Sequence, residues 1–263
     1  MNVPSPTDVK LPPFDLLVED AGALGCLGHI PTLPGLCFRA ETVADVESLA
    51  PVRIREYADW LAENGLGDLT PEVGHLASRG RAASSVRIVI AEHVAGAAVW
   101  KSGNPAVLFQ HDLRSLDDDG VIAHLRFTRR ALDEMREIVE RLSDEKRAWK
   151  PDPARRSVDE TIEHVGNCIW WYCSRIDDEL PEPEEPSGEA SADRMDRLFA
   201  AAEAYLLDVP LSVRTTVHVP TRFPTSNPHE RWTHTKVCRR EAEHVWAHLP
   251  GLKTAVRGMT PVG

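Results

Sequence analysis

The sequence predicts an α+β protein, in which a small N-terminal α/β domain (residues 1–105) precedes a four-helix bundle (residues 106–263). About the first hundred residues contain short, β-prone apolar runs. From about Asp112 onward, apolar residues recur with the 3.6-residue period of an amphipathic helix. The chain has 263 residues, of which 42% are hydrophobic and 27% charged, which suits a soluble globular protein with one or two domains.

The N-terminal domain is expected to be a small sheet with one helix across a face. The runs "FDLLVE" (14–19) and "SVRIVIAEHV" (85–94) predict strands, and "AGAAVW" and "AVLF" could add two more. Between them, residues 42–65 carry apolar side chains at helical spacing, and Gly65 follows as a stop signal. Pro51 lies inside this pattern and should kink or split the helix.

The C-terminal domain is expected to contain four amphipathic helices. Ser157 and Glu160 form an S-x-x-E capping box that should open the second of them. The fourth should stop at Pro250-Gly251. Four helices with three connections predict a bundle, whose ligand sites lie among the side chains of facing helices. The expected ranges are 118–142, 157–180, 192–207 and 233–250.

Composition and charge exclude several classes of protein. No apolar run approaches the roughly 18 residues of a membrane helix, and the N-terminus lacks a basic region followed by an apolar core, so we expect no secretory signal. The five cysteines show no CxxC pair, which favours a reducing cytoplasm over a disulfide framework. The net charge of −11 argues against nucleic acid as a partner.

Three histidines are candidate metal ligands. His244 and His248 lie four positions apart, so on one helix their imidazoles could converge on one cation. Two ligands rarely make a metal site, and a solvated helical face is the alternative. His164 could be the third, because it lies opposite the main apolar stripe of its helix, beside Cys168 and Trp171. Without a metal, it would be a histidine half covered by that indole.

Residues 108–249 resemble the DinB-like (DinB/YfiT) superfamily of metal-binding four-helix bundles. The resemblance is carried by "VLFQHDLRSLDDDGVIAHLRFTRRALDEM", "SVDETIEHVGNCIWWYCSRI" and "ERWTHTKVCRREAEHVWAHL". It implies a divalent metal held by one histidine of the second helix and an HxxxH pair of the fourth, here His164, His244 and His248. Characterised members include thiol-dependent S-transferases and isomerases that use mycothiol, bacillithiol or glutathione.

Two departures from the family pattern bear on this site. Ile169 stands where related sequences often carry an acidic residue, so a carboxylate of the outer shell is expected to be missing. Pro250 follows His248 closely, so His248 should lie in a terminal helical turn. The negative end of the helix dipole at that terminus would favour a cation.

Residues 14–65, which include "TLPGLCFRAETVADVESLAPVRIREYADWL", resemble a HicB-like α/β domain. HicB-like and DinB-like domains occur fused in this order. HicB-like domains elsewhere act as antitoxin partners, so this domain could be a protein-interaction module or could cover one side of the bundle.

Other polar residues are weaker candidates for a functional role. Glu241 could orient an imidazole or act as a catalytic base, or form an ordinary i,i+3 surface pair. Cys168 could approach the metal, but a small buried thiol is the simpler interpretation. Arg239 and Arg240 could meet an anionic substrate, or be an ordinary surface pair. The other histidines lack a partner at ligand spacing, and His234 is the least certain because it opens the fourth helix.

Three functions follow as hypotheses. The first is a cytoplasmic enzyme that holds Zn²⁺, Ni²⁺ or Fe²⁺ through the three histidines, leaves a coordination position open, and transfers or isomerises a small electrophile with a low-molecular-weight thiol. The second is a non-catalytic, stress-related or antitoxin-like interaction module. The third is a metal-assisted hydrolase with Glu241 as its base. We expect neither nucleic acid nor membrane as a partner, and an apolar second face on the second helix would permit a homodimer.

Overall fold

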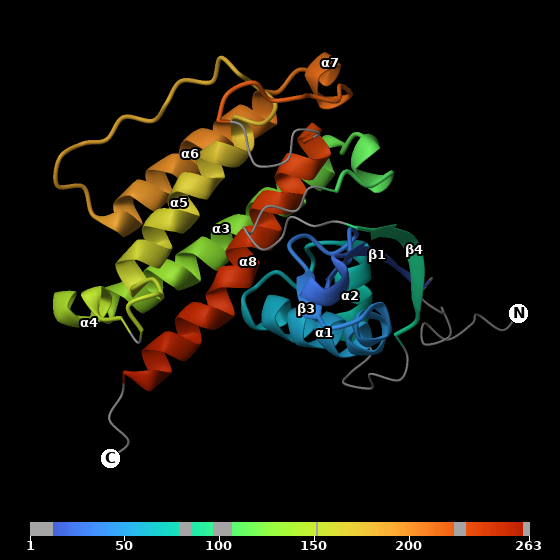
Figure 1. Ribbon diagram of the computed structural model, residues 1–263, viewed down its shortest axis with the longest axis horizontal. Helices are drawn as coiled ribbons and strands as arrows, with labels where there is room; N and C mark the ends of the chain where they lie inside the picture. The colour runs from blue at the N-terminus through green and yellow to red at the C-terminus, as the bar shows by residue number, and fades with distance from the viewer. Residues whose placement is uncertain (1–12, 79–85, 97–106, 151, 224–229, 260–263) are drawn as a thin grey trace, which may run out of the picture. The chain divides into compact units, whose positions relative to one another are not determined.

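A computed structural model describes residues 13–78, 86–96, 107–150, 152–223 and 230–259 (Figure 1). The chain divides into two compact units, Met1–Phe109 and Gln110–Gly263, and each is treated by itself below. The N-terminal unit is built around a four-stranded sheet, and the C-terminal unit is helical. The predicted α+β fold class is therefore confirmed.

The sheet of the N-terminal unit has the strand order β3-β2-β1-β4. Strands β1 and β2 pair antiparallel, as do β2 and β3, whereas β1 and β4 are parallel. The parallel pair follows from the long connection between β1 and β4, which contains both helices of the unit. The elements are β1 (Phe14–Asp20), β2 (Cys26–His29), β3 (Cys37–Ala40), α1 (Val43–Glu63), α2 (Pro71–Ser78) and β4 (Ile88–Ala95), with the short 3₁₀ helix η1 (Gly22–Leu24) after β1.

Helix α1 lies against the sheet and begins at a complete capping box. The Thr42 side chain accepts a hydrogen bond from the Asp45 backbone, and the Asp45 side chain accepts one from the Thr42 backbone. Pro51 lies inside a helix that continues to Glu63, so it does not split the helix. Gly28 of β2 permits the close packing, because a Cβ atom there would lie 2.5 Å from Cγ1 of Val46.

Two strands of this sheet, β2 and β3, were not predicted. Each has only four residues, and the "TLPG" turn between them adds no alternation of apolar and polar residues. The strands are therefore too short for the two-residue period to be detected.

Two further strands were predicted in this unit. In "AVLF", the described residues 107–109 form no strand, and Phe109 instead packs against Leu17 in a small apolar cluster. Most of "AGAAVW" lies outside the described residues.

The C-terminal unit contains four long helices, α3, α5, α6 and α8 (Figure 1). Helix α5 packs against α6 and α8, and α3 packs against α8 and α6. Gly166 permits the close approach of α5 to α6, because a Cβ atom there would lie 3.2 Å from Cα of Met195. The helices are α3 (Asp118–Glu140), α4 (Asp144–Ala148), α5 (Val158–Cys173), α6 (Ser191–Asp208), α7 (Leu211–Arg214) and α8 (His234–Gly258), with the 3₁₀ helix η4 (His111–Leu113) before α3.

Two predicted helix ends in this unit were wrong. Helix α5 ends at Cys173 and not near Leu180, and the backbone N–H of its C-cap, Ser174, is hydrogen-bonded to the preceding turn. Helix α8 continues through Pro250 to Gly258. Leu249 and Leu252, which flank the proline, are buried. Pro250 removes one backbone hydrogen bond from the helix, but the free energy gained by burying the two leucines favours continuing the helix past it.

None of the helices in the described part of the chain combines the length and the apolar character needed to cross a membrane.

Candidate metal centre

Helices α5 and α8 bring together the three histidines predicted as metal ligands. The Nε2 atom of His244 lies 3.2 Å from Nε2 of His164 and 3.1 Å from Nε2 of His248. The ring centroids are 4.6–5.1 Å apart, and each histidine offers one nitrogen that lies within 4.8 Å of the others. Among the described residues, this is a group with the geometry to hold one metal ion.

Local sequence positions each histidine. The predicted capping box of Ser157 and Glu160 is present and fixes the start of α5, so that His164 lies in the second turn. Helix α8 begins at the N-cap Thr233, whose side chain accepts a hydrogen bond from the Lys236 backbone. The spacing of four residues then places His244 and His248 on one side of α8.

The contacts among these nitrogens cannot all be hydrogen bonds. Each ring nitrogen presents either one hydrogen or one lone pair, so Nε2 of His244 cannot serve both neighbours with good geometry. A cation resolves this conflict, because it accepts a lone pair from all three rings. An ion about 2.0–2.1 Å from each nitrogen would separate the nitrogens by about 3.0–3.4 Å, and the two observed spacings lie in this range. The residues present therefore fit a divalent metal.

The environment keeps the imidazoles of His164 and His244 neutral, as metal binding requires. Burial, with a smaller contribution from the charge of Arg156, lowers the pKa of His164 to about 4. Burial also holds the pKa of His244 well below its ordinary value, and the neighbouring His248 and His164 add to the effect. His244 is only 9% exposed, whereas His164 and His248 are partly exposed, so the group opens to solvent on their side.

One of the three histidines, His244, has no carboxylate hydrogen-bonded to its second ring nitrogen among the described residues. Nδ1 of His244 is buried and has no hydrogen-bond partner among the described residues. Metal-binding histidines usually donate this second N–H to a carboxylate or carbonyl. The predicted loss of an acidic group at Ile169 is consistent with this, because Ile169 is buried as an apolar core residue.

The end of α8 does not contribute to the site in the way we predicted. Because α8 continues to Gly258, His248 lies in the interior of the helix and not in its terminal turn. The negative end of the helix dipole therefore lies about two turns beyond the predicted end of the helix. Two buried leucines around Pro250 hold this part of the helix in place.

Glu241 makes no hydrogen bond to the histidine ligands. Both of its carboxylate oxygens are buried, and neither has a hydrogen-bond partner among the described residues, so no bond joins Glu241 to a ligand imidazole. Burial, reinforced by the charge of Glu203, raises the pKa of Glu241 to about 8. Its charge acts on the buried thiols Cys173 and Cys238, which places it in the interior of the bundle.

Cys168 lies next to the first ligand. Its Sγ atom is 3.7 Å from Nδ1 and 3.8 Å from Nε2 of His164, and the side chain is partly exposed. Burial raises the pKa of the Cys168 thiol to about 11. The group is therefore a neutral thiol beside the site and not a ready thiolate ligand.

Aromatic side chains line the stretch of α5 that follows His164. The ring of Tyr172 packs edge-on against that of His244, with 5.7 Å between centroids. Trp171 packs at nearly a right angle against Trp232, also at 5.7 Å. His164, Cys168 and Trp171 are each partly exposed, so they form a strip along α5 that a small molecule can contact.

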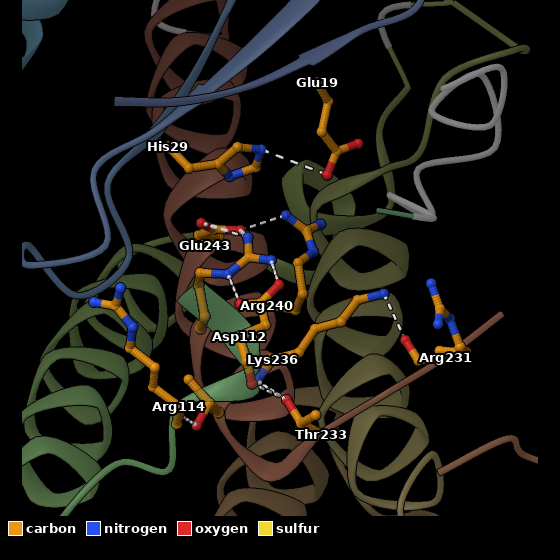
Figure 2. Close-up of polar contacts among 11 residues, drawn as sticks. Glu19, His29, Asp112, Arg114, Arg231, Thr233, Lys236, Arg240 and Glu243 are labelled. Carbon is orange, nitrogen blue, oxygen red and sulfur yellow. Dashed lines mark hydrogen bonds and ion pairs between the residues drawn. The ribbon is translucent and has the colours of Figure 1, made fainter. Parts of the chain in front are cut away.

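A buried ion-pair network joins α8 to Asp112 of η4 (Figure 2). Arg239 donates to both carboxylate oxygens of Asp112 at 2.8 Å and to both oxygens of Glu243 at 3.1 Å. Arg240 donates to Glu243 at 2.6 Å. The sequence indicated the two arginines but not their partners. The spacing of Arg239 and Glu243 could have predicted their ion pair. Asp112 is more than a hundred positions away, so nothing in the sequence predicted that it pairs with Arg239.

The remaining histidine of α8 has a structural partner. His234 is buried, and its Nε2 atom lies 3.1 Å from the backbone carbonyl of Leu206 in α6. It is not among the three histidines of the candidate centre.

Comparison with known proteins bears on the C-terminal unit. No curated protein and no solved structure matches the chain. Residues 128–249 match the family model of the DinB superfamily, and this range contains His164, His244 and His248. The match covers less than half of the chain and leaves the N-terminal unit without an assigned family. Residues 128–249 of the C-terminal unit are therefore similar to the DinB superfamily.

Proposed function

We propose that the C-terminal unit binds one divalent metal ion through His164, His244 and His248 and uses it in a thiol-dependent transfer or isomerisation of a small electrophile. The observation that carries the proposal is the convergence of three Nε2 atoms, with spacings of 3.1 and 3.2 Å, from two different helices. The DinB-like match supports it, because the resemblance implies a metal held by histidines at these positions.

The residues around the centre have separate tasks in this proposal. The three neutral imidazoles hold the ion and leave coordination positions free. When bound, Zn²⁺, Ni²⁺ or Fe²⁺ would supply a Lewis-acidic position that lowers the pKa of a thiol. Tyr172 fixes the ring of His244 by edge-on packing. The partly exposed side chains of Cys168 and Trp171 offer a surface on which the substrate can lie.

The metal content of the full chain, purified without a metal-affinity tag and then reconstituted with Zn²⁺ or Ni²⁺, tests the proposal. We expect near one equivalent by mass spectrometry in the wild type and almost none in the His164→Ala/His244→Ala double variant. The matched control is His93→Ala, because His93 is an exposed histidine that bonds only to Asp20 among the contacts described.

The outcomes separate clearly. Loss of metal in the double variant alone would support the three-histidine site. Equal metal content in the wild type and the double variant would place the ion elsewhere, and no metal in any sample would end the proposal. Circular dichroism must show that the double variant is folded.

A metal-assisted hydrolase is the weaker alternative. It requires a base close to the reacting water, and Glu241 was the candidate. Its buried oxygens make no hydrogen bond to the histidines, and its raised pKa keeps it protonated at neutral pH. Glu241 is therefore not placed to act as the base of a hydrolase.

We propose for the N-terminal unit, from its resemblance to HicB-like domains, an antitoxin-like role as a protein-interaction module. The second face of α5 would permit a homodimer.

A further inference from the structure

Cys168 lies on the same side of α5 as His164, the first of the three proposed metal ligands. The two residues are four positions apart, so their side chains are neighbours on one face of the helix. Both side chains are partly exposed, and Trp171 continues the strip towards the end of the helix. The thiol and the imidazole therefore share the side of α5 that solvent reaches.

The sulfur of Cys168 is in contact with the ring of His164. Sγ lies 3.7 Å from Nδ1 and 3.8 Å from Nε2, so it is almost equally distant from the two nitrogens. The same Nε2 atom lies 3.2 Å from Nε2 of His244. An ion about 2.0–2.1 Å from Nε2 of His164 would thus lie within about 6 Å of Sγ before any side chain moves.

A change of side-chain rotamer is enough to bring the sulfur closer to such an ion. Cysteine has a single torsion that moves a heavy atom, and its staggered positions displace Sγ while the helix stays in place. A zinc–sulfur bond is about 2.3 Å long, slightly longer than a zinc–nitrogen bond. Cys168 can therefore approach the centre without any rearrangement of α5.

The chemistry of the donor set also suits a sulfur ligand. Three histidines leave one position of a four-coordinate ion unfilled, and each binds as a neutral imidazole. A thiolate would add a soft donor with one negative charge, which Zn²⁺ accepts readily. A coordinated thiol loses its proton outright. The S–H bond breaks as the sulfur–metal bond forms, the proton passes to solvent, and neither sulfur nor metal changes its oxidation state.

We propose that Cys168 is the fourth ligand of the ion in the resting protein and that an external thiol enters the centre by displacing it. This inference rests on the proposed function, because it requires a metal ion at the three histidines. In the displacement, the incoming thiol gives its proton to the sulfur of Cys168 and takes over the bond to the metal. Cys168 would then close the centre until a thiol arrives.

Co²⁺ in place of the native metal tests this ligand directly, without any turnover. The full chain is reduced, freed of reductant and loaded with Co²⁺, and no thiol is added. Sulfur bound to Co²⁺ gives an intense charge-transfer band in the near ultraviolet, which imidazole ligands do not give. We expect this band in the wild type and its loss in Cys168→Ala, whose visible absorption should show that Co²⁺ is still bound.

Two further variants control for folding and for the other cysteines. Cys37→Ala removes another partly exposed cysteine and should keep the band. Cys168→Ser, which keeps the size of the side chain, should lose the band as Cys168→Ala does. Circular dichroism must show that each variant is folded.

Addition of 2-mercaptoethanol then tests the displacement. In Cys168→Ala the fourth position is open, so the external thiol should restore the band. In the wild type the same thiol must first release the sulfur of Cys168, which lowers its apparent affinity. We expect Co²⁺-loaded Cys168→Ala to bind 2-mercaptoethanol at least about tenfold more tightly than the wild type, measured from the spectral change.

The results separate this inference from the proposed function. Failure of Co²⁺ to bind to the wild type would overturn both. Bound Co²⁺ that shows the band only after 2-mercaptoethanol is added would overturn the role of Cys168 and support the proposed function. A band that survives in Cys168→Ala would assign the sulfur ligand to another cysteine and overturn the inference. A band that is lost in Cys168→Ala and not restored by 2-mercaptoethanol would overturn the displacement.

Discussion

The Nε2 atoms of His164 and His244 lie 3.2 Å apart, although 80 positions separate the two residues in the chain. One belongs to α5 and the other to α8, so the contact exists only when the two helices are packed together. The ligands of a metal at this site would therefore join two helices of the bundle, and metal binding and the stability of the C-terminal unit should be coupled.

The first prediction concerns this coupling. A ligand that binds only the folded state stabilises it by about 2.7 kcal/mol at a free concentration of 100 times its Kd. Adding Zn²⁺ should therefore raise the melting temperature of the wild type, measured by circular dichroism at several metal concentrations. The shift should disappear in His164→Ala and persist in His93→Ala. A similar shift in His164→Ala would show that the stabilising metal binds elsewhere.

The second prediction concerns Glu241 and pH. Burial, reinforced by Glu203, raises its folded-state pKa from 4.5 to about 8. Between these values the folded protein holds a proton that the unfolded chain releases, so the contribution of Glu241 to stability is full below pH 4.5 and is lost as the pH rises to about 8. Each pKa unit corresponds to about 1.4 kcal/mol, so the free energy of unfolding should fall by several kcal/mol from this group alone.

Urea unfolding at intervals between pH 5 and pH 9 checks this prediction. In Glu241→Gln the pH dependence should be flatter than in the wild type by the contribution of this carboxyl. Glu163→Gln, on the exposed side of α5, serves as the control and should follow the wild type. Parallel pH profiles for the wild type and Glu241→Gln would contradict the raised pKa.

The third prediction concerns Pro250, which lies inside α8 with an exposed ring. A proline there removes one backbone hydrogen bond and strains the preceding turn. Replacing it by alanine should raise the free energy of unfolding by about 1–3 kcal/mol, measured by urea unfolding. Pro153→Ala, in an exposed turn, should not stabilise the protein. If Pro250→Ala also gave no gain, α8 would end near this residue, as the sequence suggested.

The fourth prediction concerns the buried pair of Asp112 and Arg239. Removing one partner leaves the other charge buried, so Asp112→Ala should lower the free energy of unfolding by about 3–5 kcal/mol. The Asp112→Ala/Arg239→Met double variant should recover part of this loss, because it removes both charges. Thermal and urea unfolding of the two single variants and the double variant give the coupling energy. Additive losses would show that the two side chains do not interact in solution.

The sequence alone determined much of the helical part of the protein. The 3.6-residue period indicated the four long helices, and the S-x-x-E signature placed the start of α5 at the residue where the structure has it. The spacing of His244 and His248 placed both rings on one side of α8. These features are local, because they depend on residues within one or two turns of each other.

Only the tertiary structure decided how these local features combine. It paired the short strands β2 and β3, carried α8 past Pro250, and joined Asp112 to Arg239 across the chain. It also buried both oxygens of Glu241 without a hydrogen bond to the histidines. Burial and packing between distant segments decide each of these outcomes, and the free energy of burying an apolar side chain exceeds the local preference that would end a helix at one residue.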